Sequence, residues 1–166
     1  MKVIEIFDEN YKIDKVYNRI RKATRAVIID KDKLYMERTS SPQMVMLPGG
    51  GVEGGESNDE CIARECKEEC GLIVKPIKHL FAIREYYHDM IFYSVYVQCE
   101  IVGKCQKSLT DNEKSLNMTS GWQKCEDALN ELNNLMQKYR NSDEELYGCH
   151  KREYLAIKEI TNTYYV

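Results

Sequence analysis

A glycine-rich stretch that runs directly into an acid-rich segment is the feature that most restricts what this chain can fold into. Five of the nine glycines lie between positions 49 and 55. Positions 53–69 then carry seven acidic and two basic residues, a net charge of −5, so the other residues sum to +2 within a total of −3. Glycines allow sharp turns and close backbone approach, and acids crowded on one short segment repel one another. We therefore expect the functional region at this junction.

Length and composition predict one globular domain over residues 1–166. With 43% hydrophobic and 31% charged residues, the chain is long enough for one core and too apolar for disorder. It contains no run of about 18 apolar residues, and acids interrupt the apolar start at positions 1–8, so we expect neither a membrane span nor a secretory signal. A weakly acidic chain is also a poor general binder of nucleic acid, because that affinity comes from clustered Lys and Arg.

The cysteine pattern favours a reducing compartment. There are seven cysteines, an odd number, and none of them form a C-x-x-C pair. A disulfide framework is typical of small secreted chains with an even count, and a zinc site is typical of paired short spacings. We therefore expect free thiols and a cytoplasmic protein.

Hydrophobic periodicity predicts strands followed by helices. Alternation and β-branched content predict strands at 24–30, 34–39, 44–47, 73–84 and 90–101. Helical periodicity predicts helices over about 123–139 and 150–161, with a polar loop at 104–121. With one further helix between the early and late strands, this order predicts the α+β class.

That further helix lies in the acid-rich segment. Ser57 followed by Glu60 matches the capping-box pattern at a helix start, and Gly71 stands where a left-handed C-terminal cap is wanted. The segment is therefore predicted to be an α-helix over 58–70.

Three carboxylates of this helix, Glu65, Glu68 and Glu69, are spaced i, i+3 and i+4. Like charges at these spacings destabilise a helix by about 0.2–0.5 kcal/mol per pair. A hard divalent cation, which takes carboxylate oxygens, would resolve the repulsion. A plainly solvated acidic face is the alternative that the helix by itself leaves open.

The residues on both sides of these glutamates form a longer pattern at fixed spacing. From Gly50 the chain reads Gly50, Glu56, Arg64, Glu65, Cys66, Glu68, Glu69, Gly71 and Leu72. This resembles the Nudix box, G-x5-E-x7-R-E-U-x-E-E-x-G-U, where U is aliphatic. Every charged and glycine position matches, and the single departure is the cysteine at the first U position. The box covers 23 residues, the preceding sequence LPGGGVE looks like its usual lead-in, and the strand pattern over 20–140 fits the Nudix fold.

The resemblance implies a fold and a reaction. The fold is a mixed β-sheet sandwiched between α-helices, and the reaction is metal-dependent hydrolysis of the phosphoanhydride in a nucleoside diphosphate derivative, with Mg2+ or Mn2+. Two substrate classes are open. One is a nucleoside triphosphate or damaged nucleotide, whose products are a monophosphate and pyrophosphate. The other is a compound of the ADP-ribose or nucleotide-sugar type. The alternative is a catalytically silent Nudix-fold module that binds a nucleotide or a protein. The hydrolase reading implies a small nucleotide-type substrate, and composition and charge lead us to expect no membrane or nucleic-acid partner.

The resemblance also implies roles for the residues of the box. Glu65, Glu68 and Glu69 are expected to be metal ligands, with the Gly50 carbonyl as a further oxygen. Arg64 is expected to pair with Glu56 and to hold the loop against the helix.

Outside the box, an additional glutamate often completes the metal site or acts as general base in this family. Glu113 lies in a suitable polar loop, and Glu100 and Asp111 are alternatives. The base could equally be one of the box glutamates, so it stays unassigned.

Substrate contacts are predicted from residue type alone. Arg25, Arg38 and Arg84 could each pair bidentately with phosphate. Tyr86, Tyr87 and His88 lie at a predicted turn and could stack on a base. Ordinary surface arginines and packing aromatics are the alternatives. The N-terminal residues 1–20 are expected to form either an extra strand or a contact in a homodimer, since many relatives pair.

Overall fold

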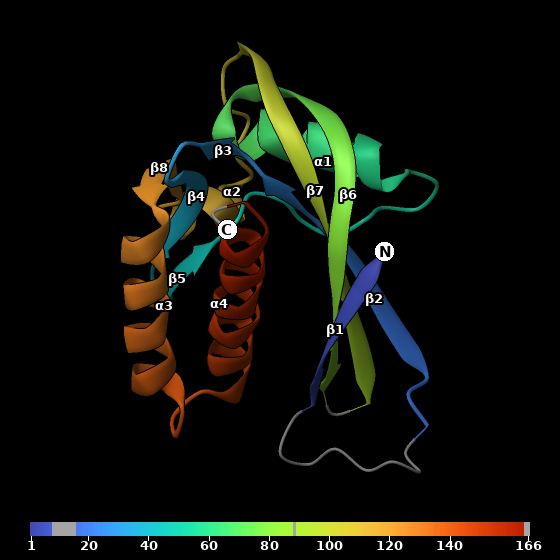
Figure 1. Ribbon diagram of the computed structural model, residues 1–166, viewed down its shortest axis with the longest axis vertical. Coiled ribbons are helices and arrows are strands. Elements are labelled where there is room, and N and C mark those ends of the chain that lie inside the picture. The colour runs from blue at the N-terminus through green and yellow to red at the C-terminus, as the bar shows by residue number, and fades with distance from the viewer. Residues whose placement is uncertain (8–15, 88, 165–166) are drawn as a thin grey trace. The chain divides into compact units, whose positions relative to one another are not determined.

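The computed structural model describes residues 1–7, 16–87 and 89–164 (Figure 1). The chain divides into two compact units. Unit 1 contains residues 1–27 and 48–107, and unit 2 contains residues 28–47 and 108–166. Each unit is described below by itself, and the predicted single-domain organisation stays a prediction.

Unit 1 is built on a four-stranded mixed sheet in the order β1-β6-β7-β2 (Figure 1). Its strands are β1 (Lys2–Phe7), β2 (Arg19–Val27), β6 (Leu72–Tyr87) and β7 (Met90–Lys104). Strands β6 and β7 are antiparallel, while β1 runs parallel to β6 and β2 runs parallel to β7. Strand β1 is thus the extra strand that was one of the two expectations for the N-terminal residues, of which 8–15 lie outside the described residues.

Helix α1 (Asn58–Glu65) and the π-helical segment η1 (Cys66–Cys70) complete this unit. Helix α1 packs against β2, β6 and β7. In the sheet, Thr24, Val95 and Ala82 are neighbours in register on these three strands, and all three are buried. Because side chains alternate between the two faces of a sheet, this row marks one buried face. The helix that carries the box is therefore fixed on a rigid sheet.

Unit 2 contains a second sheet and the later helices. Its strands are β3 (Ile29–Asp30), β4 (Lys33–Ser40), β5 (Gln43–Met46) and β8 (Thr119–Lys124). Strand β4 pairs antiparallel with each of the other three. The helices are α2 (Asp111–Ser115), α3 (Cys125–Tyr139) and α4 (Glu144–Tyr164), of which α3 and α4 pack against each other and against β5. The α+β class and the mixed sheet are confirmed.

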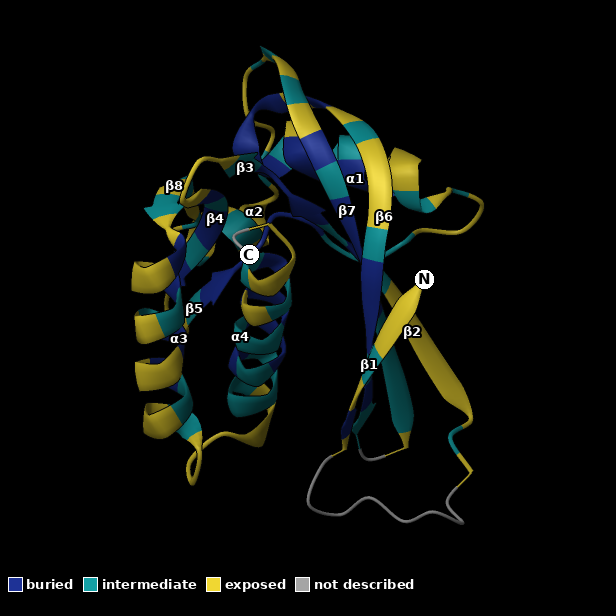
Figure 2. Ribbon diagram, viewed as in Figure 1, coloured by how far each residue is buried: buried dark blue, intermediate teal, exposed yellow. Residues whose placement is uncertain are grey.

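Helix α3 has the apolar stripe that its periodicity predicts. Its buried residues are Cys125, Ala128, Leu132 and Leu135, and exposed residues occupy the outer face (Figure 2). Such a stripe forms because residues three and four apart share one face of a helix. Helix α4 begins at Glu144, six residues before its predicted start at 150.

Two expectations need correction. The polar loop predicted at 104–121 contains helix α2 and the first residues of β8, because Thr110 caps a short helix there. The predicted α-helix over 58–70 ends at Glu65 and continues as the π-helical segment η1.

The cysteines are free thiols throughout, five of them buried and two partly exposed. Within the described residues, no helix is both long enough and apolar enough to cross a membrane.

Candidate active site

The start of the box helix is formed by the predicted capping box. The Ser57 hydroxyl accepts the Glu60 backbone N–H at 3.3 Å, and the Glu60 carboxylate accepts the Ser57 backbone N–H at 2.8 Å. Two of the backbone donors that a helix leaves unsatisfied at its start are thereby bonded. This cap places the first helical turn directly after the glycine-rich loop.

The end of the helix differs from the prediction. In η1 the N–H of Gly71 donates to the Cys66 carbonyl, five residues earlier, and Gly71 has the left-handed conformation expected of it, with φ 67°. A π-helical turn holds more residues than an α-helical turn, so it rotates the positions that follow it. Glu69 is buried, with an exposed fraction of 7%, as is Glu65 with 8%. The Glu68 side chain is 44% exposed, so the three carboxylates do not share one solvated face.

The glycine-rich loop is held along strand β2 by its own carbonyls. The backbone N–H of Thr24 donates to the Gly50 carbonyl at 3.0 Å, and that of Ala26 donates to the Pro48 carbonyl at 2.7 Å. The Arg25 guanidinium donates to the Gly49 carbonyl. Gly49 has φ 135°, and a Cβ there would lie 2.1 Å from the Thr24 carbonyl oxygen, so only glycine fits. The loop is therefore held in place along strand β2.

Arg64 lies at the centre of the box carboxylates. Its Nε and Nη2 donate to the two carboxylate oxygens of Glu56 at 3.1 and 2.7 Å, which is the ion pair expected from the resemblance. Its Nη1 donates to Glu65 at 2.9 Å and to Glu68 at 3.3 Å. Nη2 also lies 3.3 Å from the Gly51 carbonyl. One guanidinium thus joins the loop to the helix.

These contacts shift the acid–base properties of the site. Hydrogen bonds from Arg64 and from the Glu53 backbone lower the pKa of Glu56 to about 2. The carboxylates around it, with the Glu56 hydrogen bond the largest cause, raise the pKa of Arg64. Burial raises the pKa of Glu65, against the opposing charge of Arg64. Burial also raises the pKa of Cys61 to about 11, so this thiol is not a nucleophile at neutral pH.

The donor set fits a hard divalent cation in its chemistry. Carboxylate and carbonyl oxygens are the ligands that Mg2+ prefers. Gly50 is packed so closely on Glu65 that a Cβ added to it would lie 2.3 Å from Glu65 Oε1, so the Glu65 carboxylate occupies the space that a side chain at position 50 would need. Among the described residues, no three His, Cys, Asp or Glu side chains converge closely enough to hold an ion. The carboxylates of Glu65 and Glu68 are turned to Arg64 instead.

The acidic residues predicted outside the box have local partners. Glu113 caps α2: its carboxylate accepts the backbone N–H of Thr110 at 2.7 Å. Asp111 pairs with Lys114 at 3.3 Å in the same helix. Glu100 lies exposed on β7. The capping pattern T-x-x-E that ends at Glu113 is present in the sequence, and it is the signal that indicates a short helix in this polar segment.

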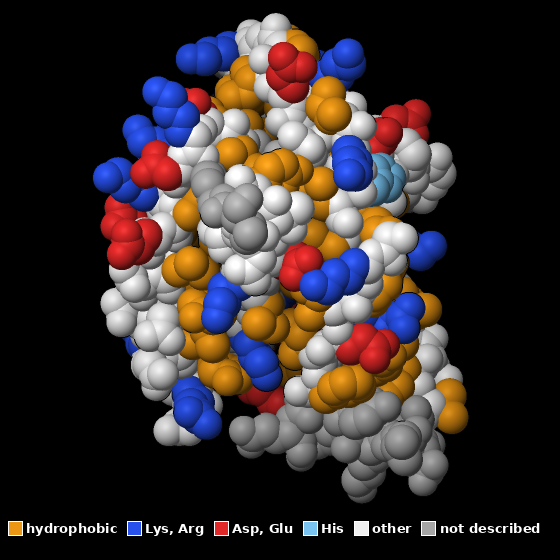
Figure 3. All heavy atoms as spheres, viewed as in Figure 1, with side chains coloured by type: hydrophobic (Ala, Val, Ile, Leu, Met, Phe, Trp, Pro, Cys, Tyr) orange, Lys and Arg blue, Asp and Glu red, His pale blue; other side chains and the backbone are white. Residues whose placement is uncertain are grey.

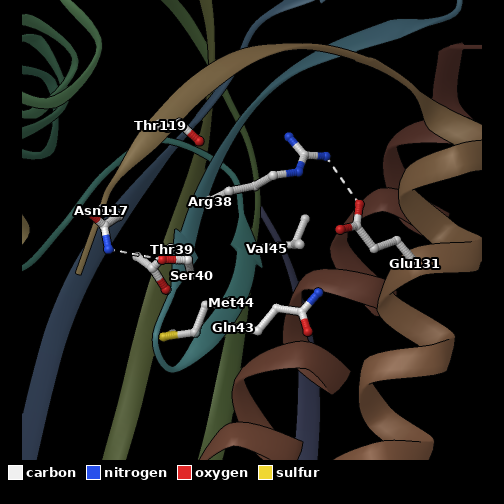
Figure 4. Close-up of a pocket in the computed structure, with 9 residues that line it drawn as sticks. All are labelled: Arg38, Thr39, Ser40, Gln43, Met44, Val45, Asn117, Thr119 and Glu131. Atoms are coloured by element: carbon white, nitrogen blue, oxygen red, sulfur yellow. Dashed lines mark hydrogen bonds and ion pairs between the residues drawn. The ribbon is translucent and has the colours of Figure 1, made fainter.

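Arg38 lines a cavity of about 410 Å³ in unit 2. Its Nη2 donates to Glu131 of α3 at 3.1 Å and also to Gln123, so it points across the cavity toward α3 (Figure 4). Asn117 and Ser40 are hydrogen bonded to each other on another wall of the cavity (Figure 4). Here Arg38 joins β4 to α3, and its role toward phosphate stays a prediction.

Arg84 and Tyr86 both contact Glu5 of β1. Arg84 Nη1 and the Tyr86 hydroxyl each lie 3.2 Å from Glu5 Oε1, and the Tyr86 ring stacks on Phe7 with centroids 5.1 Å apart. Apolar side chains are visible on the surface over β1 and the neighbouring part of β6 (Figure 3), where Phe7 is exposed. These contacts tie the added strand to the sheet. His88 lies outside the described residues.

Sequence reasoning missed a set of buried charges in unit 2. Arg152 Nε donates to Glu153 at 3.1 Å, and Glu153 also accepts the backbone N–H of Leu47 at 3.1 Å. Glu153 is 1% exposed. The available signal was its position: at helical spacing it shares an apolar face with Ile157 and Ile160. A charged residue in an apolar stripe indicates a buried polar contact.

The comparisons with known proteins agree with this fold. A 60-residue segment is 45% identical to part of the ADP-ribose pyrophosphatase of Methanocaldococcus jannaschii, covering 34% of this chain and about a third (35%) of that protein. In structure, the chain is similar to the E. coli ORF135 protein (TM-score 0.56, 16% identity, 84% of this chain and 91% of that one).

A UDP-X diphosphatase is similar too, with a TM-score of 0.51 and 20% identity, covering 66% of this chain and 54% of that one. At such identities the two solved structures show the fold alone. The decisive match is to the family described as NUDIX domain, which spans residues 19–146 and so includes the loop, the box and α3. The chain therefore belongs to the NUDIX family.

Proposed function

We propose that this chain hydrolyses the phosphoanhydride bond of a nucleoside diphosphate derivative with the help of Mg2+ or Mn2+. The observation that carries the proposal is the packing of Gly50 against the Glu65 carboxylate, beside the Arg64–Glu56 pair. It places one carboxylate of the box against a loop that is itself hydrogen bonded to β2. Such preorganisation is what a charged transition state requires.

In this proposal the box residues divide the work. Glu65, Glu68 and Glu69, with the Gly50 carbonyl, hold the cation. Arg64 and Glu56 hold the loop against the helix. The cation, when bound, neutralises pyrophosphate charge and makes a water molecule a better nucleophile. The general base is either a box glutamate or one of the acids outside the box, Glu113, Glu100 or Asp111.

For the substrate, we favour a compound of the ADP-ribose or nucleotide-sugar type over a nucleoside triphosphate. Support comes from the name of the Methanocaldococcus jannaschii relative, whose matched segment is 45% identical. Water would then add across the bond between the two phosphates, giving a nucleoside monophosphate and a phosphorylated second product. The free thiols also favour a reducing, cytoplasmic location.

The proposal also includes contacts to the substrate and pairing of two chains. We propose that the substrate is contacted by Arg25, Arg38, Arg84 and Tyr86, and that the protein forms a homodimer.

The test is a substrate panel with matched variants. The protein is incubated with ADP-ribose, a UDP-sugar and nucleoside triphosphates, with Mg2+ or Mn2+ and with EDTA, and the products are separated by chromatography. Glu68→Gln and Glu69→Gln should lower turnover by roughly 10³-fold, because each removes a cation ligand worth several kcal/mol.

Glu126→Gln, which removes an exposed carboxylate from the first turn of α3, is the control and should keep its turnover. Nucleotide binding without any product would favour the silent binding module. Full rates in both box variants would contradict the assignment of the cation ligands.

A further inference from the structure

The cavity of about 410 Å³ in unit 2 has a lining that suits a small organic ligand (Figure 4). Its apolar lining residues are Val45, which is buried, and Met44, which is half-buried. A buried apolar part with a few polar groups around it is typical of ligand pockets, whose volumes run from about 300 to 1,000 Å³. The cavity is therefore large enough for a ring system, and larger than a single phosphate group fills. Its exposed lining residues are all polar, namely Ser40, Gln43, Asn117 and Thr119.

The charged groups of the cavity cancel. Of the described residues that line it, only Arg38 and Glu131 are charged, and Arg38 Nη2 donates to Glu131 Oε2 at 3.1 Å. The same oxygen accepts Gln123 Nε2 at 2.8 Å, so the pair is completed by partners within the protein. A phosphate in this cavity would bring negative charge next to the Glu131 carboxylate, with no unbalanced cation among the lining residues to receive it. An uncharged ligand meets no such repulsion.

Two exposed amide side chains of the lining each have one half of the amide engaged. Asn117 Nδ2 donates to Ser40 Oγ at 3.1 Å, which leaves the Asn117 amide oxygen as an acceptor. Gln43 Oε1 accepts Nζ of Lys138, which does not itself line the cavity, at 3.3 Å, and this leaves the Gln43 amino group as a donor. Among the described residues, the lining therefore offers both a donor and an acceptor to a ligand. Nucleobases carry both kinds of group along their edges, and side-chain amides pair with them there.

The apolar residues suit the flat face of a ring. Met44 and Val45 are neighbours on β5, and a methionine sulfur makes favourable contacts with aromatic rings. A nucleobase combines the three properties that the cavity selects for: no charge, a flat face for apolar atoms, and donors and acceptors at the edge. A sugar lacks the flat apolar face, and a phosphate lacks both the face and the neutrality.

We propose that the cavity of unit 2 binds an uncharged nucleobase, and that Glu131 is its specificity-determining residue, because the Glu131 carboxylate neutralises Arg38 and so excludes phosphate. Arg38 contributes to the cavity as one half of a neutral pair. The inference rests on the proposed function, since a nucleoside diphosphate derivative supplies the base. In a substrate of this class, the base and not a phosphate enters the cavity.

The test uses uncharged nucleosides and inorganic phosphate as separate probes, in EDTA and without turnover. Adenosine, guanosine, cytidine and uridine are titrated into protein labelled with carbon-13 at the methionine and valine methyl groups, and the Met44 and Val45 signals are followed by NMR. At least one nucleoside should shift both signals saturably, whereas phosphate should leave them unchanged. The proposal is overturned by signals that no nucleoside shifts, and equally by signals that phosphate shifts in the wild type.

Matched variants test the part played by Glu131. Glu131→Gln and Glu126→Gln each remove one negative charge, the first from the cavity and the second from the exposed first turn of α3. Only Glu131→Gln should bind phosphate at the cavity, at least about tenfold more tightly than the wild type, because it leaves the Arg38 charge unbalanced. The double variant Arg38→Gln/Glu131→Gln restores neutrality, so it should lose this phosphate binding and keep nucleoside binding. Equal phosphate binding by the two single variants would mean that net charge alone decides, and would overturn the role of Glu131.

Turnover of the substrate panel, measured alongside, separates the base site from the proposed function. Hydrolysis without any nucleoside shift at Met44 and Val45 overturns the base site and leaves the proposed function standing. Nucleoside binding at the cavity without hydrolysis supports the base site and favours the silent binding module. If Glu131→Gln does not give the spectrum of a folded protein, the contrast between nucleosides and phosphate in the wild type still decides.

Discussion

Two arginines, Arg64 in unit 1 and Arg38 in unit 2, each lie at the centre of a polar cluster, and the clusters are similar in burial. The Arg64 side chain is 26% exposed and the Arg38 side chain 30%. Their partners differ. Arg38 contacts one carboxylate, Glu131, together with an amide, while Arg64 contacts three carboxylates. Counted over the side chains hydrogen bonded to each arginine, the Arg38 cluster is neutral and the Arg64 cluster has excess negative charge, which the positive charge of Arg25 near Glu65 offsets in part.

The difference separates a structural ion pair from a candidate site. A balanced pair needs no further ligand, and its geometry is satisfied within the protein. Excess carboxylates at close range raise one another's pKa unless a cation is supplied. The two clusters are similar in burial and each contains an ion pair, so charge balance is the property that distinguishes the candidate site at Arg64 from the pair at Arg38.

The largest effect is expected at the buried pair of α4. Glu153→Leu removes a buried carboxylate that accepts hydrogen bonds from both Arg152 and the Leu47 N–H, so the free energy of unfolding should fall by about 3 kcal/mol or more. Urea unfolding measures this. Asp89→Asn, at an ion pair whose two side chains are each 61% exposed, is the control and should change stability by about 0.5 kcal/mol or less. Equal losses of stability at both sites would show that burial does not determine how much these ion pairs contribute to stability.

A smaller effect, on activity alone, is expected when a side-chain atom is added next to Glu65 in the Arg64 cluster. In Gly50→Ala the added Cβ displaces the Glu65 carboxylate, which is the flexible end of a side chain, so the fold should survive. Misplacing one catalytic group by about 1 Å costs roughly 10²-fold in turnover. Gly54→Ala, whose added Cβ meets nothing within 4 Å, is the matched control. Turnover and the thermal midpoint are measured for both, and unchanged turnover in Gly50→Ala would remove Glu65 from the site.

The comparison predicts that removing one carboxylate lowers the free energy of unfolding at the Arg38 cluster and does not lower it at the Arg64 cluster. In metal-free buffer, Glu131→Gln should destabilise the protein by about 1 kcal/mol or less, because it leaves Arg38 without its counter-charge. Glu68→Gln should be neutral or stabilise by a few tenths of a kcal/mol, because it relieves repulsion between like charges. Denaturant midpoints in EDTA measure both variants. A clear destabilisation by Glu68→Gln would indicate that the Arg64 cluster is balanced.

The two units should also lose stability in different pH ranges. Burial lowers the pKa of His150, which is 1% exposed and stacks on Tyr139, from its ordinary 6.5. Protonation then favours the unfolded chain, so this contribution is complete above pH 6.5 and is lost as the pH falls below it. For Glu56, with a pKa lowered from 4.5 to about 2, the contribution is complete above pH 4.5 and is lost as the pH falls toward 2.

Unfolding midpoints between pH 8 and pH 3 in EDTA measure these contributions. His150→Phe, which keeps an aromatic ring on Tyr139, should flatten the decline that begins below pH 6.5. Glu56→Gln should change only the more acid part of the profile. A wild-type decline below pH 6.5 that survives His150→Phe would assign it to another group.

Local sequence was sufficient to predict the structure wherever the interacting residues are close along the chain. The capping box of Ser57 and Glu60, the cap at Gly71 and the apolar stripe of α3 all follow from spacings of a few residues. The π-helical segment was not predictable in this way. Its single extra residue places Glu69 on the buried side, and that burial depends on the sheet beneath it.

Long-range partners could not be predicted either. Arg38 and Glu131 are 93 residues apart, and Leu47 and Glu153 are 106 apart. Arg25 follows Thr24 on β2, so its contact with Gly49 exists because the loop runs along that strand. Such pairings depend on which strands are neighbours and in which register, and a one-residue slip would change them all.

The sequence by itself determined the family, the box and the uneven charge along the chain, because these reside in residue types at fixed short spacings. Only the tertiary structure decided what each charge contacts: that Arg64 binds three box carboxylates, that Arg25 holds the glycine loop, and that Arg38 is balanced by Glu131. The physical reason is that a charged side chain acts on whatever lies within a few ångströms, and folding alone brings distant residues to that range.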